Sequence, residues 1–261
     1  MSLLSSAVLV VLLGLSVHSE APTSPKDEAP QLDMTSRILE ANRRVTHILV
    51  EGDVVVSKKR NALKCWSRYC TWKKSLNGLV EVPYSISDYY YDEEKVLIQK
   101  AMETFHQKTC VRFVPYRGQS DHLSIQSEMG CWSSIGRDGG AQVVSLSVYG
   151  CLDHGTIQHE LLHALGFHHE HTRSDRDQYV RINWENLPAV NAHDFHKKDT
   201  NNLDTPYDYS SIMHYGRTAF SSALGAETIT PIPDSSVPTG QREDMSDLDV
   251  LRVNRLYGCS W

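Results

Sequence analysis

The segment "TIQHELLHALGFHHEH", from Thr156 to His171, holds five histidines in a stretch with the apolar spacing of a core helix. His159 and His163 lie four residues apart, so on a helix of 3.6 residues per turn both rings project from one face. Two imidazoles placed in this way can bind one Zn²⁺, each through a nitrogen about 2.0–2.1 Å from the metal. Glu160 can take a proton from a water molecule at the metal without binding the metal itself. The pattern therefore predicts two metal ligands and a general base on one helix.

A third ligand is predicted just after this helix. Gly166 can adopt the left-handed conformation that ends a helix, and the chain can then turn and bring His169 to the same metal. Three protein ligands leave one position for water, which is typical of a catalytic zinc site. A match that includes Gly166 and His169 arises by chance in roughly one such sequence in ten thousand, so ordinary core or surface histidines explain it poorly. Four other histidines are predicted to point away from the metal or to lie on the surface: His168, His171, His193 and His196.

The helix that carries these residues is expected over 156–165. Its apolar face is formed by Ile157, Leu161, Leu162 and Leu165. Ahead of it, alternating apolar residues predict strands over 78–86, 110–116, 122–128 and 139–148. Between the first two of these strands, residues 92–109 have helical spacing and acidic residues at their start, which suits the helix dipole.

Regular patterns are sparse after the histidines until a closing helix within 245–259. Ser246 is its expected N-cap. Its expected apolar stripe consists of Met245, Leu248, Leu251 and Leu256. Strands and a helix come first, and a helix with long loops follows. This order predicts an α+β fold of two lobes with the histidine helix between them.

The composition is that of a soluble globular protein, with 40% apolar and 22% charged residues among 261. The net charge of −6 argues against a nucleic acid partner. Residues 1–19 have a short apolar run and then small residues, which predicts a secretory signal peptide and an extracellular protein. The alternative is a buried N-terminal helix. No later stretch is long enough to span a bilayer, so no membrane partner is expected.

The cysteines fit an oxidising compartment. All six lie after residue 60, and an even set in a secreted domain is more typical of disulfides than of metal ligands. Three disulfides are therefore expected, and the sequence alone allows about fifteen pairings. Cys65 and Cys70 are close enough to join in a local loop.

Residues 20–60 differ from the rest of the chain and are called the leader here. They begin with the Pro-rich, charged "EAPTSPKDEAP" and end with Lys58, Lys59 and Arg60. A basic run is commonly a solvated face, but at this boundary we favour a processing site. The predicted domains are a signal peptide over 1–19, a propeptide over 20–60 and a catalytic domain over 61–261.

The motif "HELLHALGFHHEHTRSDRD", followed by "SIMHYG", resembles the astacins, a branch of the metzincin zinc endopeptidases. The resemblance covers nearly all of residues 50–261. It implies a two-lobed metzincin domain, with a twisted, mostly parallel sheet and helices in the N-terminal lobe. The C-terminal lobe would be loop-rich with a terminal helix, and zinc would lie in the cleft between the lobes. The sequence runs to Trp261, so a protease domain without a downstream accessory module is expected, and the protein is expected to be a monomer.

The resemblance implies roles for individual residues. His159, His163 and His169 would bind one Zn²⁺, and Glu160 would be the general base. Met213 would form an apolar floor beneath the zinc. Tyr215 would be a displaceable zinc ligand that hydrogen-bonds the oxyanion during the reaction. The implied disulfides are Cys65–Cys70, Cys110–Cys259 and Cys131–Cys151.

Protein substrates are the expected partners. The segment 139–147 could form the edge of the cleft and pair with an extended substrate, and the alternative is an interior strand. The stretch "NALKCWSRYCTWKKSLNGLVEVPY" resembles the start of six-cysteine fish astacins, which include hatching enzymes, so egg-envelope glycoproteins are the leading substrate. The alternatives are a digestive or immune-tissue astacin, an inactive zinc-binding module, and a structural matrix protein.

The leader contains "VEGDVVVSKKR", which resembles the family's FxGD propeptide motif. That resemblance places Asp53 at the metal position meant for water, with Gly52 allowing close approach of the backbone. Val50 stands where the family has Phe, which predicts weaker docking. Cleavage after Arg60 would free Asp53 and create an amino terminus at Asn61. The resemblance places that terminus near Glu170, for which the alternative is a plain surface acid.

Overall fold

The computed structural model describes residues 33–56 and 70–259. All of them belong to one compact unit, residues 32–261. The predicted signal peptide, the processing site at Arg60, the new terminus at Asn61 and Cys65 lie outside the described residues.

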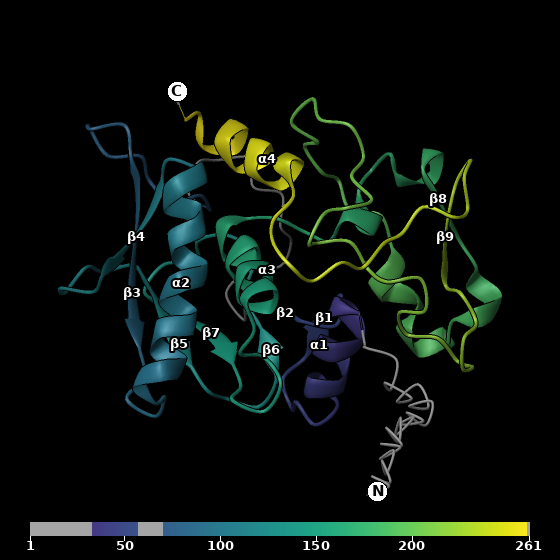
Figure 1. Cartoon of the computed structure of the whole chain (residues 1–261), viewed down its shortest axis with the longest axis horizontal. Helices are drawn as coiled ribbons and strands as arrows, with labels where there is room; N and C mark the ends of the chain where they lie inside the picture. The colour runs from purple at the N-terminus through teal and green to yellow at the C-terminus, as the bar shows by residue number, and fades with distance from the viewer. Residues whose placement is uncertain (1–32, 57–69, 260–261) are drawn as a thin grey trace, which may run out of the picture. The chain divides into compact units, whose positions relative to one another are not determined.

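Residues 80–146 contain a five-stranded sheet (Figure 1), in which the strands lie in the order β4-β3-β5-β7-β6. The strands are β3 (Val80–Ile86), β4 (Val111–Pro115), β5 (His122–Gln126), β6 (Cys131–Trp132) and β7 (Ala141–Leu146). β3 is parallel to β4 and β5, and β5 is parallel to β7, whereas β6 is antiparallel to β7. The predicted mostly parallel sheet is confirmed.

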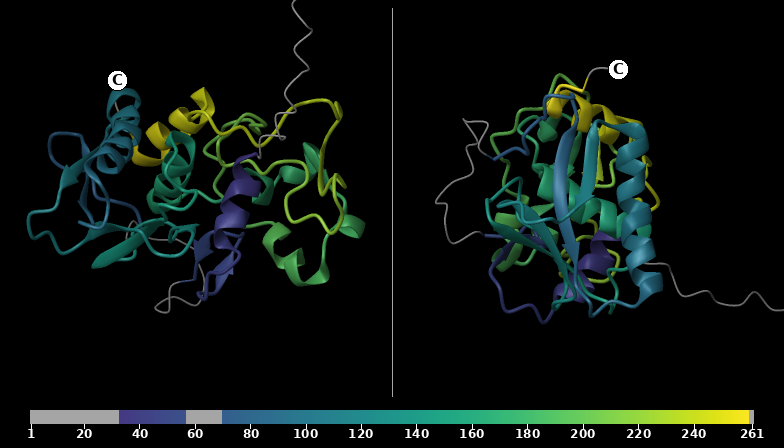
Figure 2. Two further views of the ribbon diagram at one scale, coloured as in Figure 1. Left: turned by 60° about the horizontal axis from the view of Figure 1, so that its bottom comes forward. Right: turned by 90° about the vertical axis from the view of Figure 1, so that its left-hand side faces the viewer.

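The helix α2 (Asp92–Lys108) connects β3 to β4 and lies along one face of the sheet, as the right-hand view of Figure 2 shows. Its buried residues are Ile98, Ala101, Met102 and Phe105. These positions repeat every three or four residues, so one stripe of the helix faces the core. Three acidic residues in its first turn complement the helix dipole, as expected from the sequence.

The segment 139–147, which the sequence offers as an edge strand, is interior in the structure. β7, which could have been the edge strand, lies between β5 and β6 and is interior. The edge is the two-residue β6, which is too short to give an alternating signal in the sequence. Beyond it, Ser133 N donates to Asp53 O at 3.0 Å and Val55 N donates to Ser133 O at 3.0 Å. The leader therefore pairs with the chain at this edge.

The histidine helix α3 (His154–Leu165) is buried along its whole length after His154. It begins two residues earlier than predicted, because the Asp153 side chain accepts a hydrogen bond from Thr156 N at 3.1 Å and caps it. It ends at Gly166, whose φ of 113° is the left-handed conformation predicted for this position.

The segment after α3 is loop-rich, with short 3₁₀ turns and two antiparallel strands, β8 (Val180–Ile182) and β9 (Ile229–Pro231). Its apolar side chains form a second, smaller cluster around Phe195 and Tyr215. The larger cluster contains the sheet, α2 and α3. Two clusters, one in a sheet-containing part and one in a loop-rich part, fit the predicted two-lobed α+β fold.

The closing helix α4 (Asp247–Tyr257) has Ser246 as its N-cap, as predicted, and the Ser246 side chain accepts from Asp249 N at 2.9 Å. It returns to the larger cluster through Val253 and Tyr257. The predicted apolar stripe is confirmed at Met245 and Leu256, which belong to or pack against the larger cluster. It is wrong at Leu251, which is 36% exposed, while Asp249 and Arg252 are buried. Both polar side chains have hydrogen-bond partners that make their burial possible.

The described part of the leader, residues 33–56, is folded onto the rest of the unit. It forms α1 (Met34–Asn42) and a hairpin of β1 (Leu49–Val50) and β2 (Val54–Val55). Met34 and Ile38 of α1 are buried in the larger cluster. The turn of the hairpin, residues 51–53, carries both acidic residues of the "EGD" sequence.

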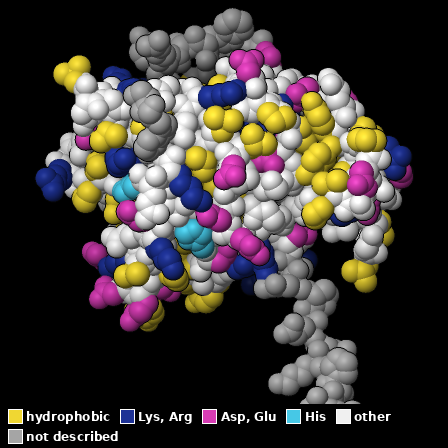
Figure 3. Space-filling view, turned by 45° about the horizontal axis from the view of Figure 1, so that its top comes forward, with side chains coloured by type: hydrophobic (Ala, Val, Ile, Leu, Met, Phe, Trp, Pro, Cys, Tyr) yellow, Lys and Arg dark blue, Asp and Glu magenta, His cyan; other side chains and the backbone are white. Residues whose placement is uncertain are grey.

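Within the described residues, no helix has the length and apolarity to cross a membrane. The face drawn in Figure 3 carries acidic and basic side chains side by side, with apolar side chains scattered among them. Several acidic side chains lie close together at the lower left of that face.

Candidate metal centre

Four side chains from three segments meet at one buried point. α3 presents His159 and His163, and the chain beyond Gly166 brings His169 to them. The leader supplies Asp53. One ligand atom of each residue lies within 4.8 Å of the others. None of the four residues is more than 2% exposed.

The spacing of these atoms fits a tetrahedral metal ion. Asp53 Oδ2 lies 3.1 Å from His159 Nε2 and 3.3 Å from His169 Nε2, and Asp53 Oδ1 lies 3.3 Å from His163 Nε2. The two ring nitrogens of His159 and His169 are 3.1 Å apart. Ligands about 2.0–2.1 Å from a tetrahedral Zn²⁺ stand roughly 3.3 Å from each other.

Unpartnered polar atoms point to the same conclusion. Among the described residues, His163 Nε2 and Asp53 Oδ1 are buried without a hydrogen bond. Buried polar groups are nearly always satisfied, and a cation between these atoms would satisfy both. The donor set, three imidazoles and one carboxylate, is one that zinc accepts. The residues therefore fit the metal.

The other ring nitrogen of each histidine is also held. His159 Nδ1 lies 2.9 Å from Ile212 O, and His163 Nδ1 lies 2.7 Å from Phe167 O. Carbonyl oxygens only accept, so Nδ1 donates in both rings and Nε2 is left for the metal. His169 Nδ1 instead meets a carboxylate, Glu51 Oε2, at 3.0 Å.

The two carboxyl groups nearest the histidines have pKa values shifted in opposite directions. Burial would raise the pKa of Asp53, but His169 and His163 outweigh burial and hold that pKa well below its usual range. Burial and the nearby Asp53 both raise the pKa of Glu160. Within the described residues, neither Glu160 oxygen has a hydrogen-bond partner, so its carboxyl is free to act on a substrate or water.

Tyr215 lies beside the metal position but does not belong to the group of four. It is 1% exposed, and its ring centroid lies 4.6 Å from that of His169. Its hydroxyl donates to Glu51 O in the leader. Met213 is buried at 3% exposure, directly after Ile212, whose carbonyl holds His159.

The histidines that were not predicted as ligands fall into two groups. His193 and His196 are exposed, as predicted. His168 and His171 do not join the metal group, yet both have partners near it. His168 Nδ1 lies 2.9 Å from Glu51 Oε1, and the His171 ring stacks on Tyr215 at a centroid distance of 3.8 Å.

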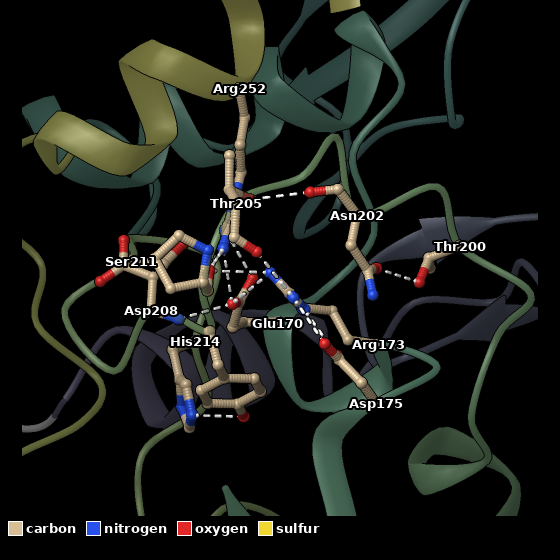
Figure 4. A network of polar contacts seen from close by, with 12 residues as sticks. Glu170, Arg173, Asp175, Thr200, Asn202, Thr205, Asp208, Ser211, His214 and Arg252 are labelled. Carbon is tan, nitrogen blue, oxygen red and sulfur yellow. Dashed lines mark hydrogen bonds and ion pairs between the residues drawn. The ribbon is translucent and has the colours of Figure 1, made fainter. Parts of the chain in front are cut away.

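Glu170, next to His169, is the centre of a buried polar network (Figure 4). Its carboxylate accepts from Arg252 at 2.6 and 2.9 Å and from Asp208 N at 2.7 Å. Burial raises the pKa of Glu170 to about 7 despite the opposing effect of Arg252. At 3% exposure it is not the plain surface acid of the alternative interpretation.

A cavity of about 1190 Å³ reaches Glu170, and Trp72, His169 and Arg252 also line it.

Two disulfides join segments that are distant in the sequence. Cys110 is joined to Cys259, and Cys131 is joined to Cys151. Cys70 is also disulfide-bonded, and its predicted partner Cys65 lies outside the described residues. The first pair links the end of α2 to the end of α4.

The sequence interpretation missed one residue at the site, Glu51. Its carboxylate contacts His168, His169 and Lys198 and is completely buried. The signal was a second acid, two residues before Asp53, in the otherwise apolar "VEGDVVV". A buried carboxylate needs partners, which could have directed attention to it.

Comparisons with known proteins agree with this geometry. Residues 68–258 match the model of the peptidase family Astacin. The chain is 56% identical to high choriolytic enzyme 1 of Oryzias latipes over 228 residues, 87% of this chain and 84% of that protein. It is 50% identical to the low choriolytic enzyme of the same species over 273 residues, 99% of this chain and 100% of that protein.

A solved structure supports the same relationship. That structure, high choriolytic enzyme 1 of Oryzias latipes, is titled a hatching enzyme zinc-protease. It matches with a TM-score of 0.74 and 57% identity, covering 77% of this chain and 100% of that chain. The family match contains all three histidines of the metal group and Glu160. The chain therefore belongs to the astacin family of peptidases and is a zinc metalloendopeptidase of that family.

Proposed function

We propose that the chain is a secreted zymogen, with a signal peptide over 1–19, a propeptide over 20–60 and a catalytic domain over 61–261. The observation that carries the proposal is the position of Asp53. This leader residue is 2% exposed and lies among the three histidines. Gly52 supports the same role, since its φ is 80° and a Cβ there would lie 3.0 Å from Phe220 Cζ of the catalytic part.

In the active enzyme, His159, His163 and His169 would hold the zinc ion. When bound there, zinc would supply a Lewis acid for the scissile carbonyl and for ionisation of water. Glu160 takes a proton from the attacking water and passes it to the leaving amine. Met213, which is buried in the larger cluster, would form the apolar floor of the site. While Asp53 and its hairpin remain in place, they occupy the space that water and substrate need.

Activation follows from cleavage after Arg60. The cavity beside Glu170 supports the idea that the new amino terminus at Asn61 enters there. Since Arg252 already neutralises Glu170, the terminus would join an existing ion pair instead of creating one. The leader leaves together with Asp53, and the edge at Ser133 becomes available to substrate.

Tyr215→Phe tests the proposed part of this residue in the reaction. In the uncleaved chain its hydroxyl is bound to Glu51 O, so loss of the leader frees it. If the free hydroxyl stabilises the oxyanion, removing it should lower kcat by roughly 10²–10³-fold and change KM little. Steady-state kinetics of the processed variant give the answer, and an unchanged kcat would remove Tyr215 from the mechanism.

The proposed substrates are egg-envelope glycoproteins. The support is the identity of 56% and 50% to two choriolytic enzymes. Processed enzyme, expected to begin at Asn61, should swell or dissolve isolated fish egg envelopes. The matched control is processed Glu160→Gln protein on the same envelopes. Intact envelopes together with rapid cleavage of casein would contradict this substrate and favour a digestive or immune-tissue role.

A further inference from the structure

We propose that Glu51 is a positioning residue for the third histidine, His169. While the leader is attached, the Glu51 carboxylate orients the His169 ring for zinc. The zymogen therefore binds zinc more tightly than the processed enzyme does. This inference rests on the proposed zymogen and zinc site. It concerns a residue two positions from Asp53, with separate contacts.

The contacts of Glu51 converge on His169 from the side opposite the metal. Oε2 lies 3.0 Å from His169 Nδ1 and accepts from His169 N at 3.3 Å. Asp53 Oδ2 lies 3.3 Å from Nε2 of the same ring. Two leader carboxylates therefore hold one imidazole through its two nitrogens. A carboxylate on Nδ1 fixes the proton there and leaves Nε2 to bind the metal.

The other two histidines differ in this respect. Their Nδ1 partners are the carbonyls of Ile212 and Phe167, which stay with the enzyme after processing. Only His169, among the three, takes its Nδ1 partner from the leader. Processing after Arg60 would remove that partner, because Glu51 leaves with the leader.

The burial of Glu51 shows how firmly it is held. Its carboxylate has no exposed surface and also contacts His168 Nδ1 at 2.9 Å and Lys198 Nζ at 3.1 Å. Its backbone N–H donates to Asp194 Oδ1 at 2.7 Å, and its carbonyl accepts from Tyr215. The φ of Glu51 is 54°, a left-handed conformation that a non-glycine residue keeps only when its surroundings impose it. These contacts position the carboxylate at His169.

The experiment compares zinc affinity in full-length protein that cannot be processed. Arg60→Ala protein, with and without Glu51→Ala, is titrated with a chromophoric zinc chelator. We expect Glu51→Ala to weaken zinc binding by about 10- to 100-fold, the usual effect of removing such a partner. Glu51→Gln keeps an acceptor and the side-chain volume, so its zinc affinity should lie between those of the parent and the Glu51→Ala protein. Glu40→Ala is the matched control, since Glu40 lies in the same leader and pairs with Arg43 at an exposed position.

Processing provides the second readout. With Arg60 intact, the wild-type chain is processed and titrated in the same way, and its zinc should be bound more weakly than that of the Arg60→Ala parent. Zinc bound equally or more tightly after processing would overturn the inference. Equal affinity in the Arg60→Ala proteins with and without Glu51 would overturn the inference alone. Parent protein that binds no zinc would overturn both this inference and the proposed zymogen site.

Discussion

Replacing Asp53 by alanine in full-length Arg60→Ala protein is expected to raise proteolytic activity far above the small basal activity of the Arg60→Ala parent. Asp53 is buried against three histidines, and loss of one partner from such a buried charged group costs about 3–5 kcal/mol. At about 1.4 kcal/mol for each factor of ten, activity on a fluorogenic peptide should rise by at least roughly 100-fold.

Two further proteins complete this experiment. Glu40→Ala in the Arg60→Ala background removes an exposed leader carboxylate and should stay silent. Fully processed wild-type enzyme sets the upper limit of activity. Val50 predicts that the leader docks weakly, so a small basal activity in the parent is compatible with the account. Full activity in the parent, with Asp53 intact, would rule out the proposed zymogen mechanism.

Glu160→Gln is expected to lower kcat/KM of the processed enzyme by roughly 10²–10⁴-fold and to leave one zinc ion per chain. The amide cannot take a proton from water, but it has nearly the same volume in a fully buried position. Zinc should remain because Glu160 lies outside the group formed by Asp53 and the three histidines.

The measurements are peptide hydrolysis and metal content on the same sample. Glu185→Gln, an exposed acid in the loop-rich part, is the matched control and should match the wild type in both. Loss of zinc from Glu160→Gln protein would show that Glu160 is a ligand. Undiminished kcat/KM would show that another group acts as the base.

The three histidine ligands could be predicted from the sequence because they lie within one short segment, residues 159–169. The spacing of His159 and His163 requires only helical periodicity, and Gly166 requires only the known conformation of helix ends. The structure shows that helix and that left-handed glycine. The return of His169 to the same point is also a short-range event, three residues beyond Gly166.

Longer-range features were not predictable in this way. The two residues of β6 offer too little alternation to mark the edge of the sheet, so 139–147 was a candidate edge although β7 is interior. The closing helix buries Arg252, whose partner Glu170 is 82 residues away in the sequence. Apolar periodicity cannot find a buried face that is made partly of ion pairs.

Glu51 is the clearest example of the same limit. Its partner His169 lies 118 residues further along the chain, and a single sequence does not show that the two meet. The resemblance directed attention to Asp53 alone. The structure shows both acids of "EGD" inside the site, on opposite sides of one imidazole.

X-ray absorption at the zinc edge, on full-length Arg60→Ala protein, tests the central claim most directly, namely that three histidines and Asp53 hold one zinc ion. The predicted spectrum has three imidazole nitrogens at about 2.0–2.1 Å and one carboxylate oxygen at about 2.0–2.2 Å, without sulfur. Asp53→Ala should retain the three imidazoles and lose the carboxylate. A spectrum with fewer than three imidazoles, with a sulfur ligand, or unchanged by Asp53→Ala would contradict the account.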